Sequence, residues 1–233
     1  MKKVTIVCAA LTISVMLVRC NSNNAPTALP DKIPGTVLLS EGFEGDLSNY
    51  KQIVYDGAEG LMTIDSSSKA HVHLGKGSLT SDSNSTSIKC RLDPTIDDSI
   101  AGLQFYIMAT KKSQTDMIVA LCRPGSSANG LFSIFGLGIG KSDSLMYVFE
   151  NAPADPINEH KSFAPFTLNK WYKCKVEYGY ADTTLSFFVD DRLVYKRGAP
   201  SPVTLQYFVV MRDGLGTQGP SGYYVDDVAI YKR

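Results

Sequence analysis

The residues of this 233-residue chain that are best suited to chemistry are carboxylates near the two ends of its sequence. Calcium requires several oxygen ligands, and backbone carbonyls of the turns at Gly42 and Gly45 could add to those of the side chains. The carboxylates can share one ion only if the fold brings the ends of the domain together; otherwise they face water at strand ends. The candidate calcium ligands are Glu41, Glu44 and Asp46 near the start, and Asp226 and Asp227 near the end.

A second candidate for metal chemistry is the pair His71 and His73. Two residues apart on a strand, they would share a face and could chelate a transition metal. His160 is the one further imidazole, and no Cys or carboxylate stands nearby at matching spacing. We therefore interpret the pair as part of an exposed polar face, since zinc sites need a closed ligand set.

Catalytic strings are missing from the sequence. A glycosidase needs two carboxylates facing each other across a groove, as in E-x-D-x-E on one strand, and this string does not occur. Glu177, inside a predicted strand, has no partner carboxylate two residues away, and there is no G-x-S-x-G elbow. The glycines at 136, 138 and 140 lack the spacing of a dinucleotide loop. These absences disfavour an enzyme without excluding one.

Recognition of a ligand by loops remains as a function. A sugar offers an apolar C–H face for stacking on aromatic rings and a polar edge for hydrogen bonds. Three predicted loops, 149–156, 163–171 and 212–221, carry aromatic and polar groups of this kind. The aromatic side chains could instead pack in the core or at a sheet edge. The candidate ligand-binding residues are Phe149, Asn151, Trp171, Arg212 and Asp213.

Alternation of apolar and polar residues predicts the elements that would position these groups. In residues 171–178, Tyr172, Cys174 and Val176 alternate with lysines, which is the pattern of a half-buried strand. Short segments of this kind recur between Gly, Pro, Asn, Asp and Ser clusters, with no long helix between them and no repeat of 20 to 50 residues. This organisation predicts an all-β, two-sheet antiparallel sandwich. The predicted strands are 36–41, 61–64, 70–74, 86–92, 100–109, 117–122, 131–139, 145–150, 171–178, 184–189, 193–196, 205–211 and 222–231.

Several of these segments resemble a known family. Trp171-Tyr-x-x-x-Val176, followed by Leu185-x-Phe-x-Val189-Asp-Asp191-x-Leu-Val, is similar to the penultimate hairpin of laminin-G-like and concanavalin A-like jelly rolls, although Asp191 stands where Gly is usual. The segments 38–44 and 224–228 resemble the first and last strands of secreted bacterial modules of this kind. The resemblance implies a jelly roll with adjacent terminal strands and a structural calcium. It implies no single function, because this fold hosts lectins, glycosidases, lyases and scaffolds.

The first 20 residues read as an export signal. Two lysines precede an apolar run over 4–18 that is shorter than the ~20 residues needed to span a membrane. Leu17-Val-Arg19-Cys20 resembles a bacterial lipoprotein signal, in which Cys20 would carry the lipid, although Arg19 stands where a small residue is usual. Ordinary cleavage after Ser22 is the alternative. We expect a signal peptide over 1–20, a flexible linker over 21–36 and one domain over 37–233.

The charge of the chain restricts its possible partners, and its cysteine content indicates whether it relies on disulfides. Lys plus Arg equals Asp plus Glu at 23 each, which leaves no basic surface for nucleic acid or anionic lipid. The domain contains three cysteines, Cys90, Cys122 and Cys174, and we expect buried thiols in preference to a disulfide framework.

Together these observations predict an exported, lipid-anchored, non-catalytic carbohydrate-binding module at the cell envelope, whose partner is a glycan and whose contact with the membrane is the lipid anchor alone. The alternatives are a polysaccharide hydrolase or lyase with an atypical active site, and an envelope adhesion or structural protein that binds another protein.

Overall fold

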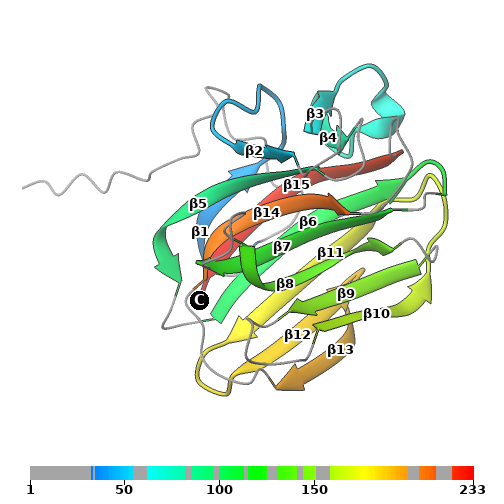
Figure 1. The fold of residues 1–233 in the computed structure, drawn as a ribbon. Helices are drawn as coiled ribbons and strands as arrows, with labels where there is room; N and C mark the ends of the chain where they lie inside the picture. The colour runs from blue at the N-terminus through cyan, green and yellow to red at the C-terminus, as the bar shows by residue number, and fades with distance from the viewer. Residues whose placement is uncertain are drawn as a thin grey trace, which may run out of the picture.

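Two antiparallel β-sheets make up the described part of the chain (Figure 1). The computed structural model describes residues 33, 35–54, 62–81, 86–96, 100–112, 115–124, 131–140, 144–150, 158–198, 205–213 and 222–233. Within these ranges no helix is long and apolar enough to cross a membrane. The prediction of an all-β, two-sheet antiparallel sandwich is confirmed.

Sheet A contains eight strands and sheet B seven, and every pairing is antiparallel. Sheet A has the order β13 (Arg192–Gly198), β12 (Thr184–Val189), β11 (Tyr172–Gly179), β6 (Ile100–Ala109), β15 (Tyr223–Lys232), β4 (Ser78–Ser81) and β3 (Met62–Asp65), and β1 (Thr36–Glu41) also pairs with β15. Sheet B has the order β10 (Asn158–Pro165), β9 (Ser144–Glu150), β8 (Leu131–Gly140), β7 (Asp116–Pro124), β14 (Leu205–Asp213), β5 (Thr86–Ile96) and β2 (Lys51–Val54).

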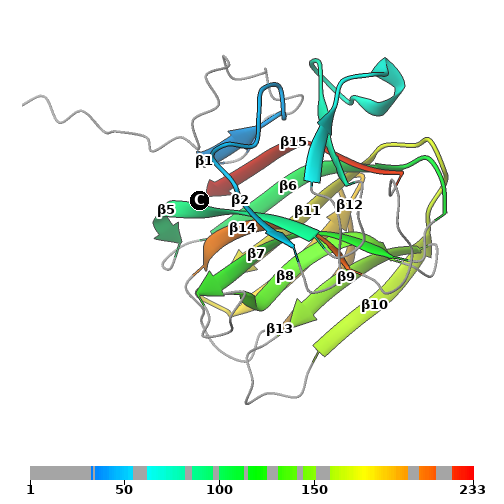
Figure 2. The ribbon, with the colours of Figure 1, turned by 45° about the horizontal axis from the view of Figure 1, so that its top comes forward.

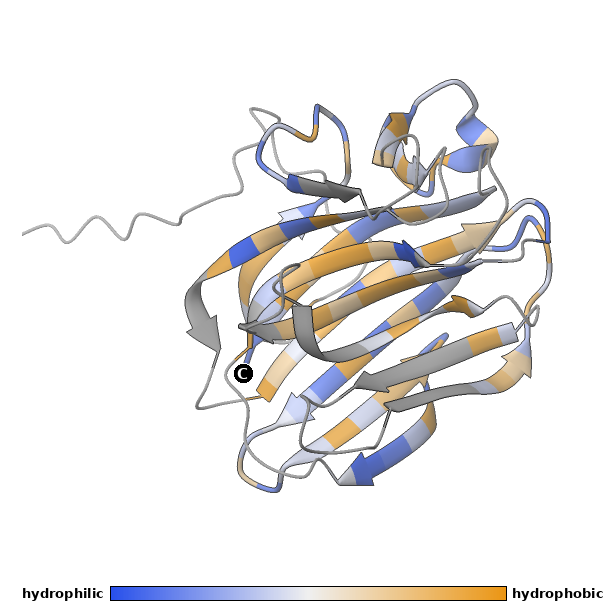
Figure 3. Cartoon of the chain, viewed as in Figure 1, coloured by the Kyte–Doolittle hydropathy of each residue, from blue (hydrophilic) through white to orange (hydrophobic). Residues whose placement is uncertain are grey.

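The core lies between the two sheets and follows the period of two along each strand (Figure 3). On β6, Leu103, Phe105 and Ile107 are fully buried in this layer, and on β12 Leu185 and Phe187 are as well. The predicted inward face of β11 is confirmed, since Tyr172, Cys174, Val176 and Tyr178 are all buried in this core.

Most predicted strands are present, but one is wrong. Residues 70–74 do not form a strand: Lys69–His71 is a short 3-10 helix, η1, and its N-cap Ser68 accepts a hydrogen bond from the Ala70 N–H at 3.3 Å. A capping serine offers the backbone a local partner in place of a strand neighbour. Strands β2, β4 and β10 are not predicted from the sequence, because they are short or lack a clean apolar alternation.

The predicted pairing of the terminal strands is confirmed. β1 runs antiparallel to β15, with Thr36 opposite Lys232 and Glu41 opposite Val228. We call the end of the sandwich where Thr36 lies opposite Lys232 the entry end. The opposite end, the distal end, holds the start of β15 and the end of β6, where Tyr223 lies opposite Ala109, and the start of β11 at Tyr172. The two ends are separated by the length of the strands (Figure 2).

The cysteines follow the prediction in part. Cys122 and Cys174 are buried free thiols, as expected. Cys90 is buried as well. The predicted signal peptide and its lipidation residue Cys20 lie outside the described residues as well.

Candidate functional site

The candidate site lies on the outer face of sheet A at the distal end, where residues 66–77 between β3 and β4 cross the sheet. The ring of His73 stacks on Tyr106 of β6 with 3.6 Å between centroids, and that of His71 stacks on Tyr224 of β15 at 4.3 Å. Trp171 meets His73 edge-on at 5.6 Å. We call the following group the His–Asp cluster: Asp65, His71, His73, Tyr106, Trp171, Tyr224, Asp226 and Asp227.

His73 is held by a buried carboxylate. Its Nδ1 lies 2.7 Å from Oδ2 of Asp227, whose side chain is 1% exposed. Asp227 has a φ of 46°, and the β15–β6 register shifts between Asp226 and Ala229, which marks a β-bulge. A bulge places an extra residue in one strand and redirects its side chain. The local irregularity of β15 is therefore what allows neighbouring aspartates to serve the same loop.

Asp226 binds the backbone of that loop. Its Oδ2 accepts hydrogen bonds from the N–H groups of His73 at 2.8 Å and Leu74 at 3.3 Å, and its Oδ1 accepts one from Asp227 at 2.8 Å. The residue is fully buried. Burial, and then the charge of Asp227, raise the pKa of Asp226 to about 8, against the opposing effect of the three N–H donors.

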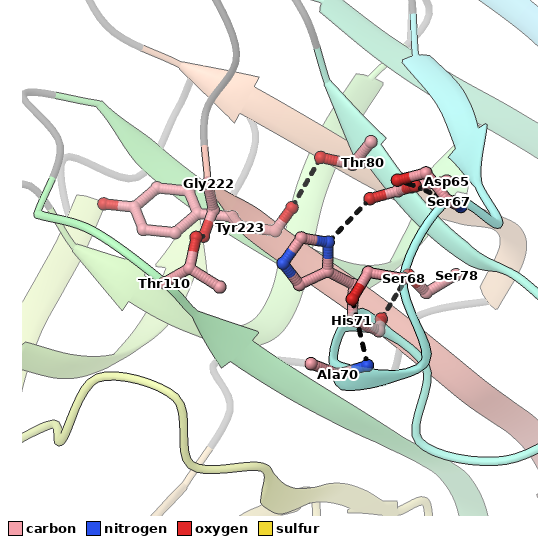
Figure 4. Close-up of polar contacts among 10 residues, drawn as sticks. All are labelled: Asp65, Ser67, Ser68, Ala70, His71, Ser78, Thr80, Thr110, Gly222 and Tyr223. Atoms are coloured by element: carbon pink, nitrogen blue, oxygen red, sulfur yellow. Dashed lines mark hydrogen bonds and ion pairs between the residues drawn. The ribbon is translucent and has the colours of Figure 1, made fainter.

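His71 has the same arrangement in a more exposed place (Figure 4). Its Nδ1 lies 2.8 Å from Oδ2 of Asp65, whose Oδ1 accepts from the Ser67 N–H and hydroxyl. The hydroxyl of Ser78 donates to the His71 carbonyl at 2.6 Å. Desolvation opposes ionisation of Asp65, but the hydrogen bonds from Ser67 and the contact with His71 together lower its pKa. The loop is thus fixed at both histidines.

These contacts leave each imidazole oriented and available. Both histidines use Nδ1 for the aspartate, and among the described residues no hydrogen bond to either Nε2 is found. Their side chains are 27% and 21% exposed. A carboxylate on Nδ1 fixes the ring orientation and tautomer, so Nε2 can exchange a hydrogen bond or a proton with a ligand. With Trp171 half-buried beside it, His73 presents a polar atom next to an aromatic surface.

The five predicted calcium ligands do not meet at one point, although the start and the end of the domain do converge on the same loop. Glu44 accepts the Lys76 N–H with both carboxylate oxygens, at 2.9 and 2.8 Å, while Asp226 binds two residues earlier at Leu74. The oxygens that a cation would need therefore accept backbone N–H groups.

Asp227 binds His73, and the two remaining predicted ligands, Glu41 and Asp46, have local partners. Glu41 is buried, accepting the Phe43 N–H at 2.7 Å and the Tyr50 hydroxyl at 2.9 Å, and burial raises its pKa. Asp46 accepts the Ser48 N–H at the surface. In the described ranges no group of three or more His, Cys, Asp or Glu could hold a metal ion. Calcium binding stays a prediction.

The predicted ligand-binding residues do not form one site, because the structure places those it describes in separate parts of the fold. Trp171 belongs to the His–Asp cluster. Arg212 is buried, and its Nε donates to the Thr115 hydroxyl at 2.9 Å, so it does not face solvent. Asp213 ends β14 at the distal end, whereas Phe149 lies in β9 toward the entry end. Asn151 lies outside the described residues.

The outer face of sheet B has a different character. Its centre is formed by Ile118, Ala120 and Cys122 of β7 with Val209 and Met211 of β14, each no more than 8% exposed. The described residues at the centre of this face are therefore apolar and buried.

Comparisons with known proteins show the fold. No family model and no curated protein matches this sequence. Among solved structures, LamA from Z. galactanivorans in complex with laminaritriose and laminaritetraose is 15% identical, with a TM-score of 0.55 over 84% of this chain and 99% of that one. A Bacillus licheniformis β-glucanase is 9% identical, with a TM-score of 0.54 over 86% of this chain and 100% of that one.

A third similar structure is the ligand-binding domain of botulinum neurotoxin serotype D in complex with N-acetylneuraminic acid. It is 12% identical, with a TM-score of 0.50 over 79% of this chain and 43% of that one. Identities this low establish architecture and nothing finer. The chain therefore has the two-sheet, antiparallel, concanavalin A-like jelly-roll fold.

Proposed function

We propose that this protein is an exported, lipid-anchored, non-catalytic carbohydrate-binding module of the cell envelope, and that it binds a saccharide at the His–Asp cluster. The observation that carries the proposal is the position of Trp171 beside His73, whose imidazole is fixed by Asp227. An aromatic surface next to oriented hydrogen-bonding groups matches the two faces of a sugar ring. Two proteins of the same fold, named above, were solved with saccharides bound.

The placement of the cluster fits a tethered module. Thr36 and Lys232 lie opposite each other at the entry end, while Tyr224 and the stacked histidines lie toward the distal end. A linker over 21–36 that reaches a lipid on Cys20 would join the domain at the entry end. The His–Asp cluster would then face away from the membrane, where a glycan can reach it.

Titration calorimetry against a saccharide panel that includes laminari-oligosaccharides tests the proposal. We expect Trp171→Ala to weaken binding about tenfold, since one aromatic contact contributes about 1 kcal/mol or more. Leu193→Ala is the control, because Leu193 is an exposed apolar residue on β13, outside the cluster. Absence of saccharide binding at millimolar concentration, or equal binding by the two variants, would contradict the proposal.

A second function, polysaccharide cleavage as a hydrolase or lyase with an atypical site, is favoured by one observation. A histidine whose Nδ1 is held by a buried carboxylate is a competent general base. Release of reducing ends from polysaccharides by the wild-type protein, lost in His73→Ala, would assign this activity. No release by the wild-type protein would leave the binding function.

A further inference from the structure

A separate cavity of about 420 Å³ lies at the open edge of the sandwich, between the edge strands β10 and β13 of the two sheets. Its volume lies within the ~300–1,000 Å³ typical of small-molecule sites. The cavity is distinct from the His–Asp cluster. Tyr172 lines it from the inner face of β11, whereas Trp171, the residue before, contacts His73.

The wall of this edge cavity is apolar. Leu145, Tyr172 and Val189 are buried, and Phe163 and Val194 are partly buried and pack against the same core. The one polar group in this wall, the Tyr172 hydroxyl, already accepts the Thr167 N–H at 2.7 Å. A ligand here must therefore present an apolar body to the wall, because a polar body would lose its water without gaining partners.

The rim of the edge cavity carries a cation without a countercharge. Lys170 Nζ lies 3.1 Å from Oδ2 of Asp190, whose Oδ1 accepts the Lys173 N–H, so these two rim charges offset each other. The side chain of Arg192 is exposed, and no hydrogen bond or ion pair to it is found among the described residues. Asp191, the residue before Arg192, is itself paired with Lys173 Nζ at 3.0 Å. The rim thus favours an anion.

We propose that the edge cavity binds a small amphiphile with an apolar body and a carboxylate, the body against Phe163, Val189 and Val194 and the carboxylate paired with Arg192. An arginine pairs with a carboxylate in a bidentate way, and burial of the apolar body supplies most of the affinity. This site is independent of saccharide binding, so either proposal can fail without the other.

Calorimetry and NMR shift mapping on the full chain, with decanoate, decanol and decyltrimethylammonium as probes, test the proposal. We expect decanoate to bind more tightly than the neutral alcohol, and the cation to bind most weakly. Arg192→Gln should weaken decanoate binding about fivefold and leave decanol unchanged, as expected for one exposed ion pair. Lys196→Gln is the matched control, since Lys196 lies on the same strand but does not line the cavity.

A second variant tests occupancy of the cavity itself. Ala164→Phe places a ring in the space that Ala164 lines, and we expect it to abolish binding of both decanoate and decanol while circular dichroism shows a folded protein. If that variant does not fold, the shift map of the wild-type protein decides. No binding of decanoate at millimolar concentration, equal binding by Arg192→Gln and Lys196→Gln, or shifts confined to residues away from β10 and β13 would each overturn the proposal.

Discussion

The two His–Asp pairs offer a comparison within one protein, because their geometry is alike and their burial differs. The distances are 2.7 Å for His73–Asp227 and 2.8 Å for His71–Asp65, but the aspartate side chains are 1% and 17% exposed. A hydrogen bond to a charged group in a desolvated place stabilises a protein by about 1.5–3 kcal/mol, whereas an exposed pair contributes about 0.2–1 kcal/mol. We expect a coupling free energy of about 2 kcal/mol for the buried pair and about 0.5–1 kcal/mol for the other.

Double-mutant cycles measure these coupling energies directly. The variants are His73→Ala, Asp227→Asn and both together, with His71→Ala, Asp65→Asn and both together as the matched set. Asparagine tolerates the positive φ of Asp227, so the backbone of the bulge can be retained. Unfolding by urea is followed by far-UV circular dichroism as well as by the fluorescence of the single tryptophan, since Trp171 contacts His73 and its signal changes with that substitution.

The result that refutes this reasoning is specific. A coupling energy below about 0.5 kcal/mol for His73–Asp227, or one no larger than that of His71–Asp65, would show that burial of Asp227 does not strengthen its pair. The His–Asp cluster would then be a set of surface contacts and not an ordered site, and the orientation of His73 would have to come from its stacking on Tyr106 alone.

Three further predictions concern stability and reactivity. Burial raises the pKa of Asp226 to about 8. Its contribution to the free energy of unfolding is therefore fully present below pH ~4, where the unfolded chain is also protonated, and is lost as the pH rises to about 8. In urea titrations across this range, the free energy of unfolding of Asp226→Asn should fall less steeply with pH than that of the wild-type protein. Gly102→Ala should lower the free energy of unfolding by about 1–3 kcal/mol, since a Cβ there would lie 2.0 Å from the Tyr231 ring. Gly198→Ala is the control in the same thermal melts: a Cβ there has nothing within 4 Å, and the change should be less than about 1 kcal/mol. Burial raises the pKa of Cys174, so this thiol should react with Ellman's reagent only after denaturation, and rapid labelling of the native protein would contradict the buried placement.

β1, β6 and β12 have the predicted bounds. In β12 buried and partly buried residues alternate, and this period of two identifies a half-buried strand. β6 is a longer, mostly apolar segment that is buried on both faces. β4, with the sequence SLTS, holds its place through pairing with β3 and β15, which no local pattern reveals. The wrong strand over 70–74 contains Val72, whose β propensity is overridden when Ser68 caps η1.

The site was predicted less well than the fold, and the reason is long-range contact. The sequence predicts Asp226 and Asp227 as calcium ligands, but their partners lie at His73 and Leu74, about 150 positions earlier in the chain. The spacing of His71 and His73 predicts a polar strand face, whereas each ring stacks on a tyrosine.

The position of β15 has a consequence for how the chain acquires its structure. The last strand in the sequence lies in the interior of sheet A, with β6 on one side and β1 and β4 on the other. Sheet A therefore cannot close until β15 has been synthesised after the other described strands, and high contact order makes such folding slow, on a scale of about milliseconds to seconds. Deletion of residues 223–232 would remove the strand that joins β6 to β1 and β4, and would separate the two parts of sheet A.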